Sequence, residues 1–175
     1  MRIDTHVHSR ASRDGSMEIS TVLARAKAAG LDAVAICDHN STAAFAGLPG
    51  WDAQNGNAQT LSGVLLIRGC EFSTEIGHIA ALFVPQDIEH ALPSANRQYR
   101  ACDVLDAVHR AGGLCVWAHP CKGPYCGRTH VLLSGNSALP FDLLEGYNGR
   151  ASVTRKGDLN AAFSAELEAL GMTVP

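Results

Sequence analysis

Short apolar runs alternate with amphipathic stretches along most of this chain. The apolar runs predict strands at residues 2–4, 33–37, 64–67, 78–84, 114–118 and 141–144. The amphipathic stretches predict helices at residues 18–29, 98–110 and 159–170. Strands that alternate with helices in this way favour a mostly parallel α/β sheet or barrel.

Composition is typical of a folded globular protein. The 175 residues predict a single domain, 46% of them are apolar, and the mean hydropathy is +0.02. Fourteen basic and 17 acidic residues give a net charge of −3, which argues against an extensive nucleic-acid-binding surface. Because no apolar run approaches the ~20 residues of a membrane helix, we expect no membrane partner.

Cysteine usage indicates a reducing compartment. Cys37, Cys70 and Cys115 sit in or beside apolar runs and are expected to be core thiols. The first residues lack the apolar stretch of a secretion signal, so we expect a cytoplasmic protein. One further spacing matches no common structural zinc site: Cys121-x4-Cys126-x3-His130.

Histidines and carboxylates recur at the ends of the predicted strands. Each alone has an ordinary structural explanation, such as a surface histidine or a turn aspartate. Together they sit where a parallel barrel places its active site. His and Asp/Glu are also the usual ligands of Zn²⁺, Mn²⁺ and iron. We therefore expect a site for several metal ions, formed by His6, His8, Asp14, His39, Glu71, His78 and His119.

The same residues lie in motifs that resemble those of a known family. The motifs are HVH at 6–8, SRDG at 12–15, CDHN at 37–40, GCEFS at 69–73, GH at 77–78 and AHP at 118–120. In this order and spacing they resemble the motifs of the PHP (polymerase and histidinol phosphatase) family, over nearly the whole chain. The resemblance implies a distorted (β/α)7 TIM-like barrel with a trinuclear metal centre and phosphoesterase activity.

The resemblance also implies a ligand set. The first metal would take His6, His8 and Glu71, and the second would share Glu71 and add His78 and His119. The third would take Asp14 and His39. The cations would be Mn²⁺, Zn²⁺ or Fe²⁺ in two to three sites, and the residues expected to serve catalysis are Glu71, His119 and Asp38.

Weaker candidates flank these motifs. Asp38 and Asn40 could orient the ring of His39 or simply make local turn bonds. The nearby cations could hold a substrate anion or merely be solvated, and these are Lys122, Arg128, Arg10 and Arg13. Two further polar residues are expected to face the cleft, Glu145 and Asn148.

Three functional hypotheses follow. The first is a metal-dependent phosphoesterase that hydrolyses a small phosphomonoester, or a nucleotide or oligonucleotide end, through a metal-activated water. The second is a metal-binding but catalytically weak module or fragment. The third is an amidohydrolase-like enzyme that cleaves C–N bonds. Glu71 as a carboxylate bridge, together with Asp14, favours the first.

The family pattern ends in one more strand with an Asp-x-His motif, and no such motif follows the predicted helix at 159–170 in this sequence. Parallel barrels usually need about 250 residues. We therefore expect residues 1–175 to be a single domain truncated before that strand, with a weak third metal site. The open sheet edge would favour self-association. If three ions bound tightly, His130, Asp142 or a partner chain would have to supply the missing ligands.

Overall fold

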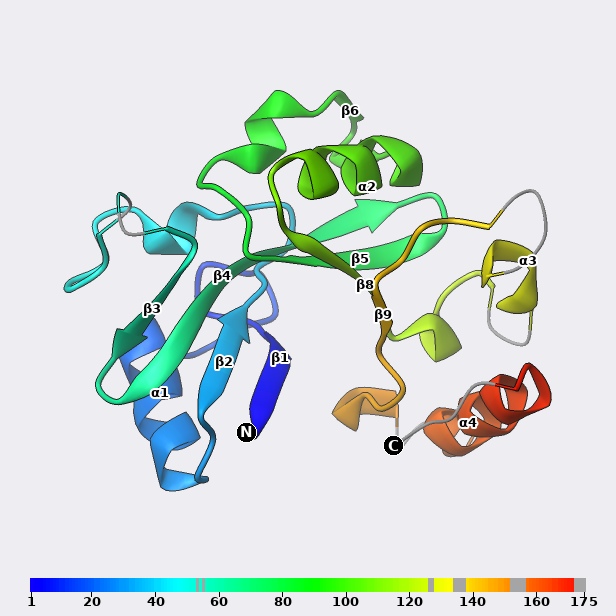
Figure 1. The fold of residues 1–175 in the computed structure, drawn as a ribbon, viewed down its shortest axis with the longest axis horizontal. Helices are drawn as coiled ribbons and strands as arrows, with labels where there is room; N and C mark the ends of the chain where they lie inside the picture. Colours follow the sequence, from blue (N-terminus) through cyan, green and yellow to red (C-terminus); the bar gives the residue numbers. More distant parts are fainter. Residues whose placement is uncertain (53, 55, 126–127, 134–137, 152–156, 172–175) are drawn as a thin grey trace.

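A curled mixed sheet runs through the centre of the computed structural model. The structure describes residues 1–52, 54, 56–125, 128–133, 138–151 and 157–171. The main path of the sheet follows the order β1 (Ile3–Val7), β2 (Ala33–Ile36), β4 (Val64–Thr74), β5 (Gly77–Leu82), β8 (Leu114–Ala118) and β9 (Leu143–Leu144). All six predicted strands are therefore present, and together they form an open half-barrel (Figure 1).

The direction of β5 corrects the prediction of a mostly parallel barrel. Strands β1, β2 and β4 are parallel, but β5 pairs antiparallel with both β4 and β8. The cause is a tight hairpin in place of a crossover helix: Thr74 Oγ1 donates a hydrogen bond to the Gly77 carbonyl at 2.8 Å. Gly77 has φ +112°, a conformation that favours glycine. The described residues thus form a half-barrel of mixed strand direction, whereas the resemblance implied a (β/α)7 barrel that is incomplete at its C-terminus.

Shorter elements extend the sheet and its loops. Strand β3 (Ala58–Leu61) pairs antiparallel with the first half of β4. Strands β6 (Ser94–Ala95) and β7 (Gln98–Tyr99) form a small hairpin beside the end of β4, so the helix expected from residue 98 begins only at Ala101. The short helical turns are η1 (Ala43–Phe45), η3 (Ile88–Ala91), η4 (Pro120–Lys122), α3 (His130–Leu133) and η6 (Gly149–Ala151).

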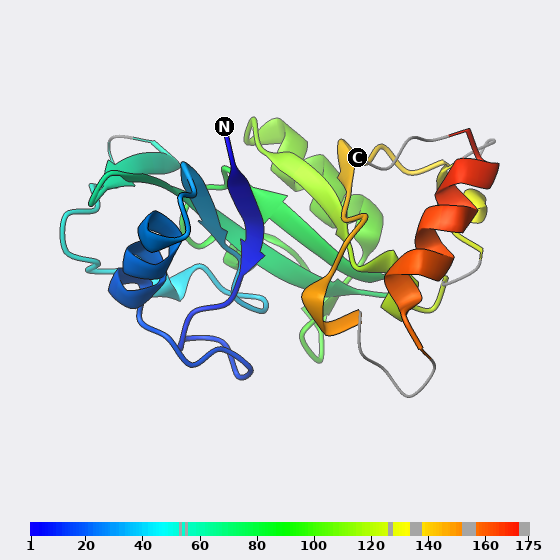
Figure 2. The same ribbon diagram turned by 90° about the horizontal axis from the view of Figure 1, so that it is seen from below.

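The three helices that the sequence predicted are present, and two of them pack on the sheet. Helix α1 (Ile19–Ala28) packs on β2 and the first half of β4, and α2 (Ala101–Arg110) packs on β4, β5 and β8. Helix α4 (Leu159–Ala169) lies at the opposite end from α1 (Figures 1 and 2). No helix in the described part of the chain is long and apolar enough to cross a membrane.

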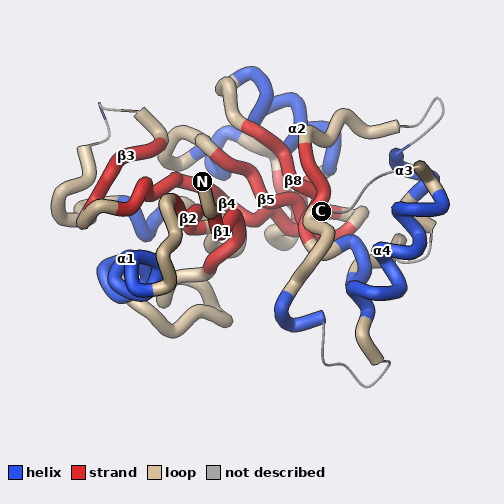
Figure 3. Tube along the Cα trace, turned by 60° about the horizontal axis from the view of Figure 1, so that its bottom comes forward, coloured by secondary structure: helices blue, strands red, loops and turns tan. Residues whose placement is uncertain are grey.

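The face of the sheet that carries the polar motifs is lined by small apolar side chains. Residues two apart in a strand share a face, so Ile67 and Glu71 lie on one side of β4. The buried cluster on this side consists of Ala33, Ala35, Cys37, Ile67, Ala80, Leu82, Val116 and Ala118. The strands that carry this cluster run through the middle of the molecule (red in Figure 3). Burial of Cys37, Cys70 and Cys115 as thiols confirms the prediction for these residues.

Gly69 is predicted to be intolerant of any side chain. A Cβ atom at this position would lie 2.5 Å from Cys37 Sγ and 2.8 Å from the Ala81 carbonyl oxygen. Gly69→Ala should therefore lower the free energy of unfolding by about 1–3 kcal/mol, as overpacked cores do. Urea denaturation followed by circular dichroism measures this, with Gly149→Ala as the control, since its Cβ would meet nothing within 4 Å. Equal midpoints for the two variants would contradict the prediction.

Candidate metal centre

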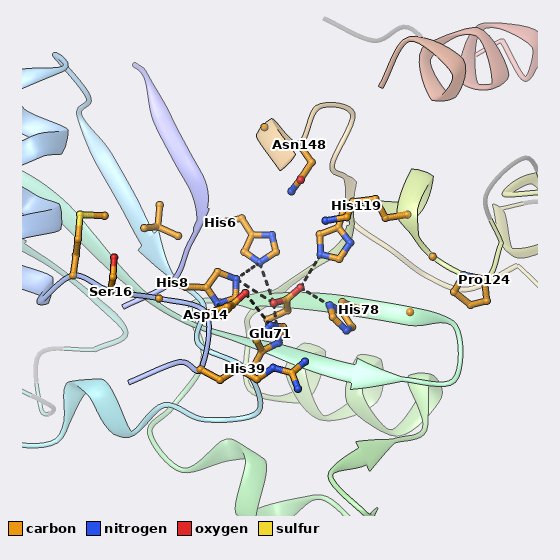
Figure 4. A pocket seen from close by; sticks show the side chains of 18 residues that line it. His6, His8, Asp14, Ser16, His39, Glu71, His78, His119, Pro124 and Asn148 are labelled. Carbon is orange, nitrogen blue, oxygen red and sulfur yellow. Dashed lines mark hydrogen bonds and ion pairs between the residues drawn. The ribbon is translucent and has the colours of Figure 1, made fainter. Parts of the chain in front are cut away.

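The predicted metal ligands converge at one edge of the half-barrel. His6 and His8 lie at the end of β1, His39 follows β2, and His119 follows β8. His78 begins β5, but because β5 is reversed its amino end meets the carboxyl ends of the other strands. Figure 4 shows these side chains pointing toward one another around Glu71.

Glu71 is the centre of this cluster and is only 1% exposed. Its Oε2 atom faces three imidazole nitrogens, which are Nε2 of His6 at 3.4 Å, Nε2 of His8 at 3.2 Å and Nδ1 of His39 at 3.0 Å. Its Oε1 atom faces two more, which are Nδ1 of His78 at 2.8 Å and Nε2 of His119 at 2.9 Å. One carboxylate therefore stands between two separate groups of imidazoles, as a bridging ligand does.

Asp14 forms a third group with His8 and His39. Its Oδ1 atom lies 3.2 Å from Nδ1 of His8, and its Oδ2 atom lies 3.5 Å from Nε2 of His39. The loop that carries Asp14 lies so close to the end of β1 that a Cβ on Gly15 would be 1.8 Å from the Ser9 carbonyl oxygen. Only glycine therefore fits after Asp14.

The charges in this cluster shift the pKa values of its members. Burial opposes ionisation of Glu71, but the facing imidazoles of His119, His6, His78 and His8 hold its pKa far below the usual range. Burial likewise opposes protonation of His6, yet Glu145 and Glu71 together raise its pKa to about 10. The pKa of His39 is lowered by burial, despite the nearby carboxylates. The cluster therefore consists of one ionised carboxylate surrounded by several imidazoles, each of which can hold a proton or a metal ion.

The residues fit divalent metal ions. Nδ1 of His39 and Oε2 of Glu71 are buried and 3.0 Å apart, yet neither has a hydrogen-bond partner. The Nε2 atoms of His6 and His8 face each other at 3.2 Å, where at most one proton fits between them. Lone pairs that converge without donors are what a cation needs, and imidazole with carboxylate suits zinc, manganese and iron.

Asp38 has a different contact from the one expected. Its carboxylate is 1% exposed and accepts hydrogen bonds from the backbone N–H of Ser9 at 2.7 Å and from the Ser9 hydroxyl at 2.6 Å. The carboxyl end of β2 lies beside the turn after His8, so the side chain reaches that turn and not the ring of His39. Asp38 therefore holds the loop that presents His8.

Asn40 fixes His39 beside Glu71. Its backbone N–H donates to the Glu71 carbonyl at 2.9 Å, and its side-chain oxygen accepts from the backbone N–H of Ser73 at 2.8 Å. Its φ of +52° is left-handed, a conformation that asparagine tolerates better than most residues. These bonds continue the pairing of β2 with β4 past the end of β2.

A cavity of about 750 Å³ opens over the cluster. Two of the four flanking cations, Arg13 and Lys122, line it. Arg10 instead pairs with Glu18. Arg128 donates to the Pro124 carbonyl and is not among the described residues that line the cavity.

The remaining candidates divide between the cavity and the rest of the molecule. Asn148 lines the cavity, and Glu145 contacts both His6 and His119. Asp142 points elsewhere and accepts hydrogen bonds from His109 Nε2 and the Cys115 N–H. His130 begins α3, and Cys126 lies outside the described residues.

Comparisons with known proteins identify a family and several structures of similar fold. A family model described as PHP domain matches residues 4–169. An amidohydrolase structure from Chromobacterium violaceum, with bound sulfate and no metal, superposes with a TM-score of 0.65 at 18% identity, over 98% of this chain and 84% of that one. A putative metal-dependent phosphoesterase structure from Bifidobacterium adolescentis gives 0.58 at 16% identity, over 96% and 84%.

Endonuclease Q, bound to duplex DNA with an abasic lesion at its active site, is a third structural neighbour. It superposes with a TM-score of 0.64 at 20% identity, over 86% of this chain. The match spans only 44% of the endonuclease chain. At these identities the structural likenesses establish the fold.

Replacement of Glu71 is predicted to remove bound metal. Glu71→Gln keeps the size of the side chain but removes the charge that faces five imidazoles, so metal content should fall below about one ion per chain. Elemental analysis after dialysis measures it. Glu89→Gln is the matched control, because Glu89 is also buried but accepts hydrogen bonds from Thr42. Full metal content in Glu71→Gln would show that the carboxylate does not bridge.

Metal affinity is predicted to depend on pH through His6. Its pKa of about 10 in the metal-free protein means that ligation at neutral pH must displace a proton. Zinc affinity should therefore rise by up to about tenfold per pH unit from pH 7 toward pH 9, because proton competition weakens. At lower pH, protons compete more strongly with the metal for the ligand nitrogens, so metal content should fall toward pH 5.

Calorimetry in buffers of different ionisation enthalpy measures the protons released. At least one proton per chain should leave on zinc binding near pH 7.5. Zinc binding without proton release, or metal content unchanged at pH 5, would contradict the assignment of His6 and its neighbours as ligands.

Proposed function

Because the chain belongs to the PHP domain family, with which residues 4–169 match, we propose that it is a metal-dependent phosphoesterase. The substrate would be a small phosphomonoester or the end of a nucleotide or oligonucleotide. The observation that carries the proposal is Glu71, whose two oxygens face separate groups of three and two imidazoles. That arrangement suits two cations held close together, as in two-metal phosphate chemistry.

Each residue then has a definite task. When bound, divalent cations such as Mn²⁺, Zn²⁺ or Fe²⁺ would neutralise phosphate oxygens and lower the pKa of a coordinated water. Glu71 would bridge two ions, with His6 and His8 on one side and His78 and His119 on the other. Asp14 and His39 would hold a third ion. Asp38 would support the first pair through Ser9.

Positive charge at the cavity wall supports a phosphorylated substrate. Lys122 and Arg13 line the cavity together with the metal cluster, where their cationic groups would bind a second anionic group of the substrate. The cavity volume of about 750 Å³ lies within the roughly 300–1,000 Å³ range of small-ligand sites. A net charge of −3 also favours a small substrate over an extended nucleic acid.

Two of the structural neighbours suggest alternative substrates. The Chromobacterium violaceum neighbour is described as an amidohydrolase, so a C–N bond is the first rival. Endonuclease Q cuts DNA, so a nucleic-acid strand is the second. A metal-binding chain with weak or no catalysis is the third reading.

A substrate screen at defined metal loading separates these readings. Protein loaded with Mn²⁺ or Zn²⁺ should release phosphate from an aryl phosphate or from members of a nucleotide panel. Glu71→Gln should lower this turnover by about 100-fold or more. Loss of a residue that only hydrogen-bonds to a metal ligand already lowers activity by about 10–100-fold. Glu89→Gln should retain it.

The other outcomes identify the rivals. Turnover of amides and not of phosphate esters would replace the proposal with C–N hydrolysis. Cleavage confined to duplex DNA would identify a nuclease. Bound metal without turnover of any substrate would favour the inactive module.

A further inference from the structure

Glu145 approaches His6 from the side opposite to the metal-ligating cluster. Glu145 Oε2 lies 3.3 Å from Nδ1 of His6. The other ring nitrogen, Nε2, faces Oε2 of Glu71 at 3.4 Å and Nε2 of His8 at 3.2 Å. An imidazole with one nitrogen on a metal commonly donates its other N–H to a carboxylate.

We propose that Glu145 is a positioning residue for the metal centre, and this rests on the proposed role of His6 as a ligand. Its carboxylate accepts a hydrogen bond from the Nδ1–H of His6. That bond selects the tautomer in which Nε2 carries the lone pair that a metal would take. It also fixes the plane of the ring, which His6 could otherwise turn about its χ2 bond.

A second contact ties Glu145 to the other group of ligands. The same Oε2 atom accepts the backbone N–H of His119 at 2.7 Å. His119 has φ +31°, a strained conformation for a residue other than glycine, so its loop needs such a restraint. Since the His119 ring lies 2.9 Å from Oε1 of Glu71, one carboxylate positions a ligand on each side of the bridge.

The Glu145 side chain is itself held in place. Its Oε1 atom accepts from Nδ2 of Asn148 at 2.9 Å, and its backbone N–H donates to the Trp117 carbonyl at 3.0 Å. Asn148 is paired twice with Asn160 of α4: its N–H donates to Asn160 Oδ1 at 2.9 Å, and Asn160 Nδ2 donates to its carbonyl at 3.1 Å. Asn160 is 4% exposed and the other members are half-buried, so this series of bonds links α4 to His6 away from the fully exposed surface.

The rival role for Glu145 is direct ligation. His6, His119 and Glu145 have potential ligand atoms within 4.8 Å of one another, close enough for one ion. That role would require Nδ1 of His6 to bind the ion and therefore to carry no proton. The two roles thus predict opposite protonation of the same nitrogen.

The experiment compares Glu145→Gln with Asp142→Asn. Asp142 lies three positions earlier on the same segment, but its carboxylate faces His109 and the Cys115 N–H. Zinc affinity, measured by competition with a chromophoric chelator, should weaken about 10–100-fold in Glu145→Gln. The Asp142→Asn variant should stay within about twofold of the unchanged protein.

Long-range ¹H–¹⁵N spectra of the zinc-loaded protein supply the second measurement. We expect a protonated Nδ1 on His6, with its proton shifted downfield by the carboxylate and moved upfield in Glu145→Gln. An unprotonated Nδ1 in the unchanged protein would overturn the proposal in favour of direct ligation. Equal zinc affinities for the unchanged protein and Glu145→Gln would also overturn it.

These measurements do not depend on turnover. A protein that hydrolyses no phosphate ester but shows both effects would refute the proposed function and leave the role of Glu145 intact. A protein that hydrolyses phosphate esters but shows neither effect would refute only the role of Glu145. If Glu145→Gln does not fold, the protonation of Nδ1 in the unchanged protein still decides between the two roles.

Discussion

The buried carboxylate of Glu71 is the constraint on which the rest of the structure depends. Glu71 is 1% exposed, and burial of a negative charge destabilises the folded protein unless cations or hydrogen-bond donors surround it. Five imidazoles from four segments of the chain meet this need, and the small residues beneath the site leave room for them to converge. The same arrangement favours metal binding. The imidazoles that stabilise the negative charge of Glu71 can also ligate metal ions together with its carboxylate.

The hairpin between β4 and β5 makes this convergence possible within a short chain. His78 follows Glu71 by only seven residues, yet its Nδ1 atom lies 2.8 Å from Glu71 Oε1. A parallel crossover would have needed a dozen or more residues to bring the next strand alongside. Because β5 runs antiparallel to its neighbours, His78 at its amino end lies beside the histidines at the carboxyl ends of the other strands.

Local patterns predicted the helices, the main strands and the residues that converge around Glu71, because periodicity and residue type report on nearby structure. They did not predict the direction of β5, since Thr74–Gly77 is a turn whose geometry depends on a glycine with positive φ. The contact of Asp38 with Ser9 was also missed, because it joins residues 29 positions apart. Glu145 was expected only to face the cleft, and its bond to His6 spans 139 positions, which no local pattern reports.

The bond between His6 and Glu145 also joins the two ends of the described sheet. His6 belongs to β1, the first strand of the path, and Glu145 directly follows β9, the last. These strands do not pair with each other in the path, so side chains at the metal centre connect the two edges where backbone bonds do not. Two cations bridged by Glu71, one held by His6 and the other by His119, would reinforce this connection. Because a ligand that binds only the folded state stabilises it, bound metal would stabilise the arrangement of these two edges through the same residues.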